Sequence, residues 1–183
     1  NAELGEPGPF SRAFWFHGTR TFAGNTFPRG LLALNHSKSL AAKMLVDLAP
    51  DELVRKRLRQ WFETGDVPDA LFQLRTGDSM HWGPYGHLVR ELHFHARENG
   101  LHDYLHLPEL VEDVCNAYLK QYGHDLTAYY LKVLHPCIIW FEADISYEKG
   151  AIETALAYAY TSVRALPPDC HATIGIDCKG KSV

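Results

Sequence analysis

The sequence has no long apolar run and no excess of basic residues. Its 183 residues carry 18 Lys and Arg against 22 Asp and Glu, a formal net charge of −4. No apolar stretch approaches the roughly 18 residues that a membrane-spanning helix needs, so we expect no membrane span. Without a broad basic surplus, the composition does not indicate nonspecific binding to a polyanion.

Cysteine is scarce. The four cysteines, Cys115, Cys137, Cys170 and Cys178, form no Cys-x-x-Cys pair. Cys170 and Cys178 flank a predicted strand and could form a disulfide only if the chain turned back there, so we favour buried, reduced thiols. A nucleophilic Cys170 helped by His171 is a weaker alternative, because adjacent strand residues point to opposite faces.

Glycine and proline are concentrated at the N-terminus, where residues 1–10 are typical of a linker. We therefore expect a single domain over 11–183, cut from a longer chain or produced by processing. Helical periodicity predominates across 37–135, and within it we expect a helix over 87–99.

Strands are predicted over 12–17, 137–145 and 172–176, where β-branched and aromatic residues are enriched. Residues 151–165 are ambiguous, since their Ala and Leu content favours a helix and an alternation at 158–161 favours a strand. A strand, a helical middle and further strands predict an α+β fold.

The most informative segment follows the aromatic run 14–16, which predicts a buried strand ending at His17-Gly18-Thr19. The His17 imidazole can bond a sugar hydroxyl while Thr19 fixes the ring, and Gly18 lets a ligand approach backbone N–H and C=O groups. Arg20 could bind a phosphate. A strand-end turn with a structural His17 explains the same residues about equally well.

Residues 16–20, followed after a loop by Gly30-Leu31-Leu32, resemble the opening of the ADP-ribosyltransferase fold. The likeness is to the His-Tyr-Glu branch shared by diphtheria-type toxins and poly-ADP-ribose polymerases. It implies that His17 and Gly18 hold the nicotinamide riboside half of NAD, a substrate here. His17, Gly18, Thr19 and Arg20 are therefore our candidates for NAD binding, and His17 is also a catalytic candidate.

The family's middle tyrosine stacks on nicotinamide. Gly83-Pro84-Tyr85-Gly86 resembles the Gly-x-Tyr of that branch, and a flat ring in a rigid turn suits stacking. Tyr85 is the resulting candidate and Tyr147 the alternative. An ordinary packed turn tyrosine is a slightly simpler interpretation of Tyr85.

Residues 164–169 resemble the Pro-Pro close of many ADP-ribosylating toxins, in which the catalytic glutamate lies on a strand shortly before this turn. Such a glutamate bonds the ribose 2′-hydroxyl and stabilises an oxocarbenium-like transition state. Glu153 is our first candidate and Glu142 the second. Either side chain could instead be a solvent-facing carboxylate.

The resemblance implies a split β core with a large helical insertion. The implied reaction transfers ADP-ribose from NAD to a protein or nucleic-acid acceptor with release of nicotinamide, and NAD glycohydrolysis at the same site is the alternative. A toxin effector domain acting in a target-cell cytoplasm, with a parent polypeptide or an immunity partner, fits this interpretation. No Glu-x-Glu or Gln-x-Glu pair precedes the Pro-Pro turn, so the arginine-specific branch is not indicated.

Histidines are crowded between residues 81 and 106 and leave two other hypotheses open. The i, i+4 spacing of His102 and His106 would suit a metal-dependent hydrolase if that segment were helical. His-Glu-x-x-His is absent, so we assign no metal ligand. A non-enzymatic, mostly helical interaction domain is the other hypothesis. The crowded histidines are expected to titrate at about pH 6 and to make the fold acid-sensitive.

Overall fold

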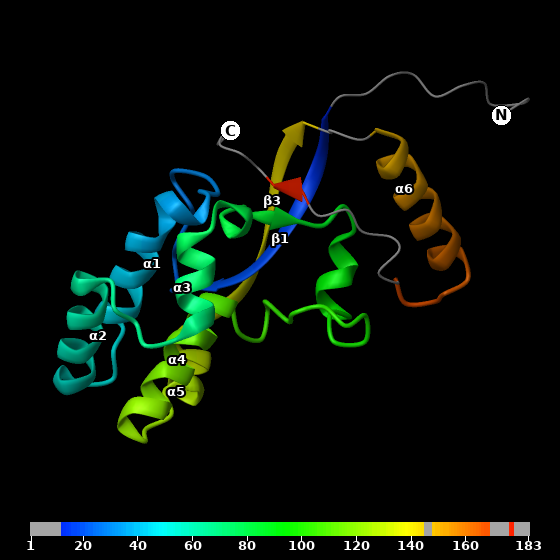
Figure 1. Ribbon diagram of the computed structural model, residues 1–183. Helices are drawn as coiled ribbons and strands as arrows, with labels where there is room; N and C mark the ends of the chain where they lie inside the picture. The colour runs from blue at the N-terminus through cyan, green and yellow to red at the C-terminus, as the bar shows by residue number, and fades with distance from the viewer. Residues whose placement is uncertain (1–11, 145–147, 169–175, 178–183) are drawn as a thin grey trace, which may run out of the picture.

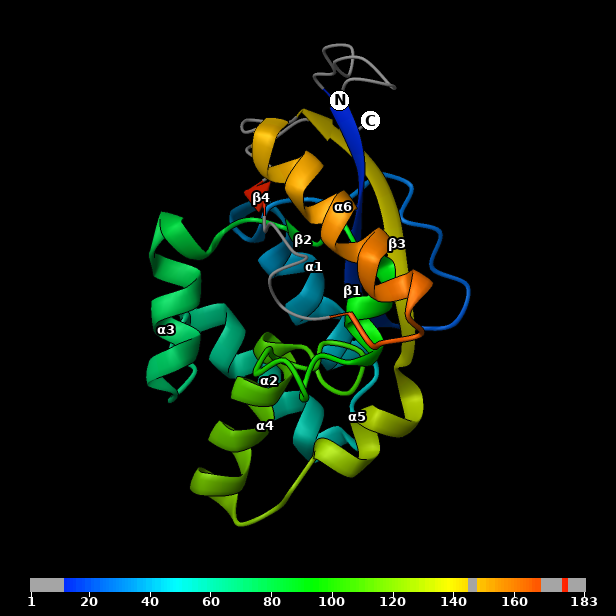
Figure 2. The same cartoon turned by 90° about the vertical axis from the view of Figure 1, so that its right-hand side faces the viewer.

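The computed structural model describes residues 12–144, 148–168 and 176–177. It mixes helices and strands, so the predicted α+β class is confirmed. Two long strands cross the middle of the molecule, with helices α1 to α5 at one end (Figure 1). Helix α6 runs beside these strands on the side away from α1 and α2 (Figures 1 and 2).

The elements follow one another along the chain as a long strand, a mainly helical stretch, a second long strand and a last helix. Their bounds are β1 (Arg12–Thr21), α1 (Leu34–Asp47), α2 (Glu52–Thr64), α3 (Ala70–Gly77), the 3₁₀ turn η1 (Ser79–His81), β2 (Tyr85–Gly86), the 3₁₀ turn η2 (Arg90–Phe94), α4 (Glu109–Tyr122), α5 (Thr127–Val133), β3 (His135–Asp144), α6 (Glu148–Val163) and β4 (Ile176–Asp177).

Strand β1 is antiparallel to β3, in a register that pairs Arg12 with Asp144 and Thr21 with His135. Strand β2 pairs with β4, and it reaches β1 through two 2.8 Å backbone hydrogen bonds between Phe16 and His87. The described strands therefore lie side by side in the order β3, β1, β2, β4 (Figure 2).

The predicted end of the first strand at residue 17 is wrong. Residues 18 to 21 remain paired with 135 to 138 of β3, so His17, Gly18, Thr19 and Arg20 lie inside β1. Pairing with a β-branched partner strand outweighs the weak strand propensity of Gly18. This matters for the site, because residues inside a strand point alternately to opposite faces.

The main hydrophobic core lies within the helical end of the molecule. Leu45, Leu58, Val114 and Leu126 are fully buried there, and the Tyr130 hydroxyl donates to the Leu45 carbonyl at 2.7 Å. Local sequence chemistry explains the ends of α2: Asp51 accepts from the Val54 amide at 2.8 Å, and Gly65 closes the helix with a φ of 77°. These helices place α1 and the start of α4 opposite β1.

The structure overturns the helix predicted over 87–99 and decides the ambiguous stretch 151–165. Residues 87–99 form η2 and turns instead of a helix, since the backbone of His87 is committed to β1 and Val89 is extended. Residues 151–165 are mostly helical in α6, where the Ala and Leu content prevails. Of the predicted last strand only residue 176 is described, as the first residue of β4.

The remaining expectations concern the cysteines, the membrane and the termini. Cys115 is free and buried, burial raises the pKa of its thiol to about 12, and Cys137 is free and half-buried. Cys170, Cys178, His171, Tyr147 and the linker 1–10 lie outside the described residues. Within the described ranges, no helix combines the length and the apolar character that crossing a membrane demands.

Candidate functional site

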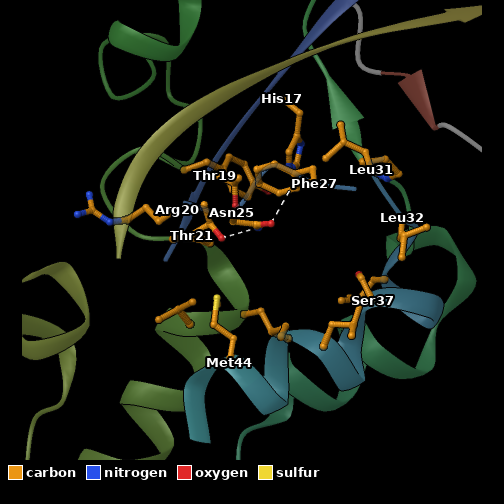
Figure 3. Close-up of a pocket in the computed structure, with 18 of the residues that line it drawn as sticks. His17, Thr19, Arg20, Thr21, Asn25, Phe27, Leu31, Leu32, Ser37 and Met44 are labelled. Carbon is orange, nitrogen blue, oxygen red and sulfur yellow. Dashed lines mark hydrogen bonds between the residues drawn. The ribbon is translucent and has the colours of Figure 1, made fainter. Parts of the chain in front are cut away.

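A pocket of about 630 Å³ lies between β1, the loop 22–33, α1 and the N-terminal end of α4 (Figure 3). Its size is in the range of pockets that hold small organic ligands. The polar side chains in its lining include His17, Thr19, Tyr85, Tyr104 and Glu109. The apolar lining comes mainly from the loop and from α1, and includes Phe27, Leu31, Leu32, Leu40 and Met44.

His17 is held in one orientation by β2. Its Nδ1 lies 2.8 Å from the Tyr85 carbonyl oxygen, which can only accept, so Nδ1 carries the hydrogen. Burial lowers the pKa of His17, against the raising effect of this hydrogen bond, and nearby His93 lowers it further. The ring is therefore neutral near pH 7, and its Nε2 offers a lone pair as an acceptor.

A carboxylate that sequence reasoning missed, Glu109, lines the same pocket as this histidine. The Tyr104 ring lies 6.4 Å from that of His17, and its hydroxyl donates to Glu109 Oε2 at 2.8 Å. The other oxygen of Glu109 accepts from Arg75 at 3.0 Å, and Arg75 also forms an ion pair with buried Asp113. Burial, aided by Glu109, raises the pKa of Tyr104 and keeps the phenol protonated.

The sequence signal for Glu109 was only that of a helix start. Pro108 precedes it and α4 begins at Glu109, where the helix dipole favours an acidic side chain. Nothing in the sequence links this carboxylate to Arg75 or to His17, because the fold brings the three together from separate elements.

Gly18 faces away from the pocket, toward η2. A Cβ at this position would lie 2.6 Å from Nδ1 of His93, whose Nε2 bonds the Phe16 carbonyl at 3.0 Å. A glycine is needed at position 18 because the His93 imidazole packs against its Cα and leaves no room for a Cβ. Phe16 forms its backbone hydrogen bonds with His87, at the edge of β1 that faces β2. Because every second residue of a strand directs its N–H and C=O to the same edge, those of Gly18 also point toward the β2 edge.

Arg20 borders the pocket, but its side chain points away from it (Figure 3). The guanidinium donates to the carbonyls of Leu105 at 2.7 Å, Leu131 at 2.7 Å and Leu134 at 2.5 Å. The guanidinium therefore binds carbonyl groups at the C-terminal end of α5 and is not directed toward a phosphate in the pocket, contrary to the expectation for Arg20. Of the other cations in the lining, Arg75 is bound by Glu109 and Asp113 and Lys43 forms an ion pair with Asp47, whereas Arg29 is exposed.

The structure brings neither predicted glutamate to the pocket. Glu142 lies on β3 opposite Phe14 and forms an ion pair with Arg12 at 3.3 Å. Glu153 is exposed on α6, a helix where the resemblance implied a strand. Tyr85 does lie in the lining beside His17, half-exposed.

The histidines do not assemble a metal site within the described residues, where no group of three or more metal-binding side chains converges. The segment that carries His102 and His106 is not helical: both residues lie in the irregular stretch before α4, and His102 Nε2 bonds the Leu107 carbonyl at 2.6 Å. His87 and His93 instead meet with their rings 5.1 Å apart, close to His17.

No protein-family model matches the chain, and comparisons with curated proteins and with solved structures find no match either. The chemistry of the pocket is therefore the ground on which a function is inferred.

Proposed function

We propose that the chain cleaves the N-glycosidic bond of NAD and transfers ADP-ribose to a protein or nucleic-acid acceptor, releasing nicotinamide. The observation that carries the proposal is the pairing of His17 with Tyr85. These residues are 68 positions apart in the chain, the His17 ring is hydrogen-bonded at 2.8 Å to the backbone carbonyl of Tyr85, and both residues line one pocket. The resemblance to His-Tyr-Glu ADP-ribosyltransferases requires such a pair around nicotinamide riboside.

Each group in this proposal has a role that suits its chemistry. The Nε2 lone pair of neutral His17 accepts a hydrogen bond from a ribose hydroxyl, and the Thr19 hydroxyl lies two residues along the same strand face. The Tyr85 ring stacks on nicotinamide. Gly18 offers its backbone N–H and C=O at the edge of β1 to the carboxamide.

Glu109 takes the role for which the sequence had suggested Glu153 or Glu142. Its carboxylate is in the pocket lining and is fixed by Arg75 and Tyr104. A fixed negative charge stabilises the positive charge that develops on the ribose as nicotinamide leaves. With water as the acceptor, the same groups perform NAD glycohydrolysis.

The rest of the fold has a place in the same proposal. The strands β3, β1, β2 and β4 are its β core, and α1 to α5 are its helical insertion. Arg29, which is exposed in the lining, is available to the diphosphate of NAD.

The test is nicotinamide release from NAD, measured with the purified protein alone and with cell lysate as a source of acceptors. His17→Ala and Glu109→Gln are each expected to reduce the rate at least about tenfold, a barrier increase of about 1.4 kcal/mol. His106→Ala is the matched control, because the His106 side chain is exposed and outside the lining.

Thermal melting of each variant separates lost chemistry from lost folding, and His17→Gln provides a milder change at the same position. If wild type and His17→Ala release no nicotinamide under either condition, the proposed function is wrong.

A further inference from the structure

The backbone of Phe27 is held in a conformation that its residue type disfavours. Its φ is +49°, and in the described part of the chain only Ala165 shares a positive φ among residues other than glycine. For a bulky aromatic residue this left-handed conformation is strained. Phe27 also precedes Pro28, which further restricts its backbone.

Hydrogen bonds on both sides keep Phe27 in this conformation. Its N–H donates to Asn25 Oδ1 at 3.1 Å, and Asn25 Nδ2 donates to Thr21 Oγ1 at 2.8 Å (Figure 3). Its carbonyl accepts from the Gly30 N–H at 2.8 Å, which closes a turn over residues 27–30. The last residue of β1 thus fixes where the Phe27 side chain points.

That side chain points into the pocket. Figure 3 shows Phe27 beside His17, with the helix that carries Ser37 and Met44 across the hollow. No described aromatic ring stacks on Phe27, whereas many other aromatic rings of the chain are paired. A strained conformation maintained by surrounding bonds is typical of ligand-binding positions.

The charged neighbours of Phe27 indicate what would lie on its ring. Arg29 belongs to the same turn, is exposed and lines the pocket, whereas Lys43 of α1 is paired with Asp47. An unpaired aromatic face beside an exposed guanidinium suits a flat heteroaromatic ring linked to a phosphate.

We propose that Phe27 is the stacking platform for the heteroaromatic ring of a nucleotide in this pocket, with Arg29 next to its phosphate. The inference rests on the proposed function for NAD as the source of that nucleotide. Both ends of NAD are nucleotides, so the shared chemistry is a base with a phosphate, and the two ends are separated experimentally.

The experiment measures the Kd of the full chain for NAD, AMP and nicotinamide mononucleotide by calorimetry. Phe27→Gly is expected to weaken binding about tenfold or more, the effect of one lost base–aromatic stack. If the Kd for AMP rises together with that for NAD in Phe27→Gly, the adenine end lies on Phe27. If the Kd for nicotinamide mononucleotide rises instead, the nicotinamide end lies there. Phe27→Tyr should keep the affinity within about twofold, because it keeps the ring face.

A readout of stability distinguishes stacking from packing. Glycine adopts a φ of +49° without strain, so Phe27→Gly should retain or raise Tm while affinity falls. Phe94→Gly is the control, since Phe94 is 60% exposed and lies outside the lining.

The outcomes separate this inference from the proposed function. If wild type binds NAD and Phe27→Gly binds it equally well, Phe27 is not a platform and the proposed function stands. A fall in Tm with unchanged Kd assigns Phe27 to packing and also overturns the inference. If wild type binds none of the three nucleotides, both proposals are wrong.

Discussion

On one face of β1, His17 and Thr19 line the pocket, while on the opposite face Gly18 accommodates the His93 ring and Arg20 binds the carbonyls that end α5. The four residues are contiguous, and in sequence they form a single motif. Their division follows from the two-residue period of a strand. Changes on the pocket face should therefore affect ligand binding, and changes on the opposite face should affect folding.

The largest expected effect comes from acid, which acts on His17 on the pocket face and on His93 and its neighbour His87 on the opposite face. Burial lowers the pKa of His17 and of His93, and burial with the charges of His93 and His17 lowers that of His87 to about 4. In the unfolded chain these histidines take up protons at about pH 6.5, whereas in the folded protein they take up protons only at a lower pH. The contribution of His87 to stability is therefore complete above about pH 6.5 and is lost as pH falls toward about 4, and the contributions of His17 and His93 are lost in the same direction.

For His87 alone, this shift corresponds to about 3 kcal/mol of unfolding free energy. Urea denaturation between about pH 7 and about pH 4 measures it. His87→Gln should flatten the pH dependence, and His106→Gln should not. If the unfolding free energy of His87→Gln depends on pH as strongly as that of the wild type, His87 is not the source of the acid sensitivity.

Gly18→Ala is the next largest effect and tests the folding face directly. Its methyl group would meet the His93 ring, and overpacking of this kind costs about 2 kcal/mol. Thermal and urea unfolding give the loss. Gly77→Ala is the matched control, because nothing lies within 4 Å of a Cβ there. His93→Ala added to Gly18→Ala should recover part of the loss; additive losses would mean that the two residues do not interact.

Arg20→Met is the smallest of the three effects. It removes the charge that binds the last carbonyls of α5 while keeping an apolar stem, and we expect a loss of about 1 kcal/mol. Denaturant unfolding measures this loss against Arg59→Met, whose side chain is exposed on α2. If Arg20→Met instead leaves stability unchanged and weakens NAD binding, Arg20 acts on the pocket face and the division is wrong.

Sequence reasoning performed best where local chemistry determines structure. Asp51 and Gly65 mark the ends of α2, and the β-branched run after Pro136 forms β3, because caps and propensities act within a few residues. It failed over 87–99, where pairing with β1 overrides a helical pattern.

In the site, the sequence indicated His17 and Tyr85 but could not indicate Glu109. The carboxylate gains its place through Arg75, which is 34 residues away, and through Tyr104, which no motif marks. The conformation of Phe27 likewise depends on Thr21 and Asn25, not on any preference of its own.

The pairing of β1 with β3 also has a consequence for how the molecule is made. Strand β1 is synthesised well before its partner β3, which begins only at His135, after α1 to α5 have been synthesised. Until then the aromatic strand that carries His17 has an unpaired edge, which is the kind of segment that associates with other chains. The residues met first in the sequence are thus among the last to acquire their native neighbours.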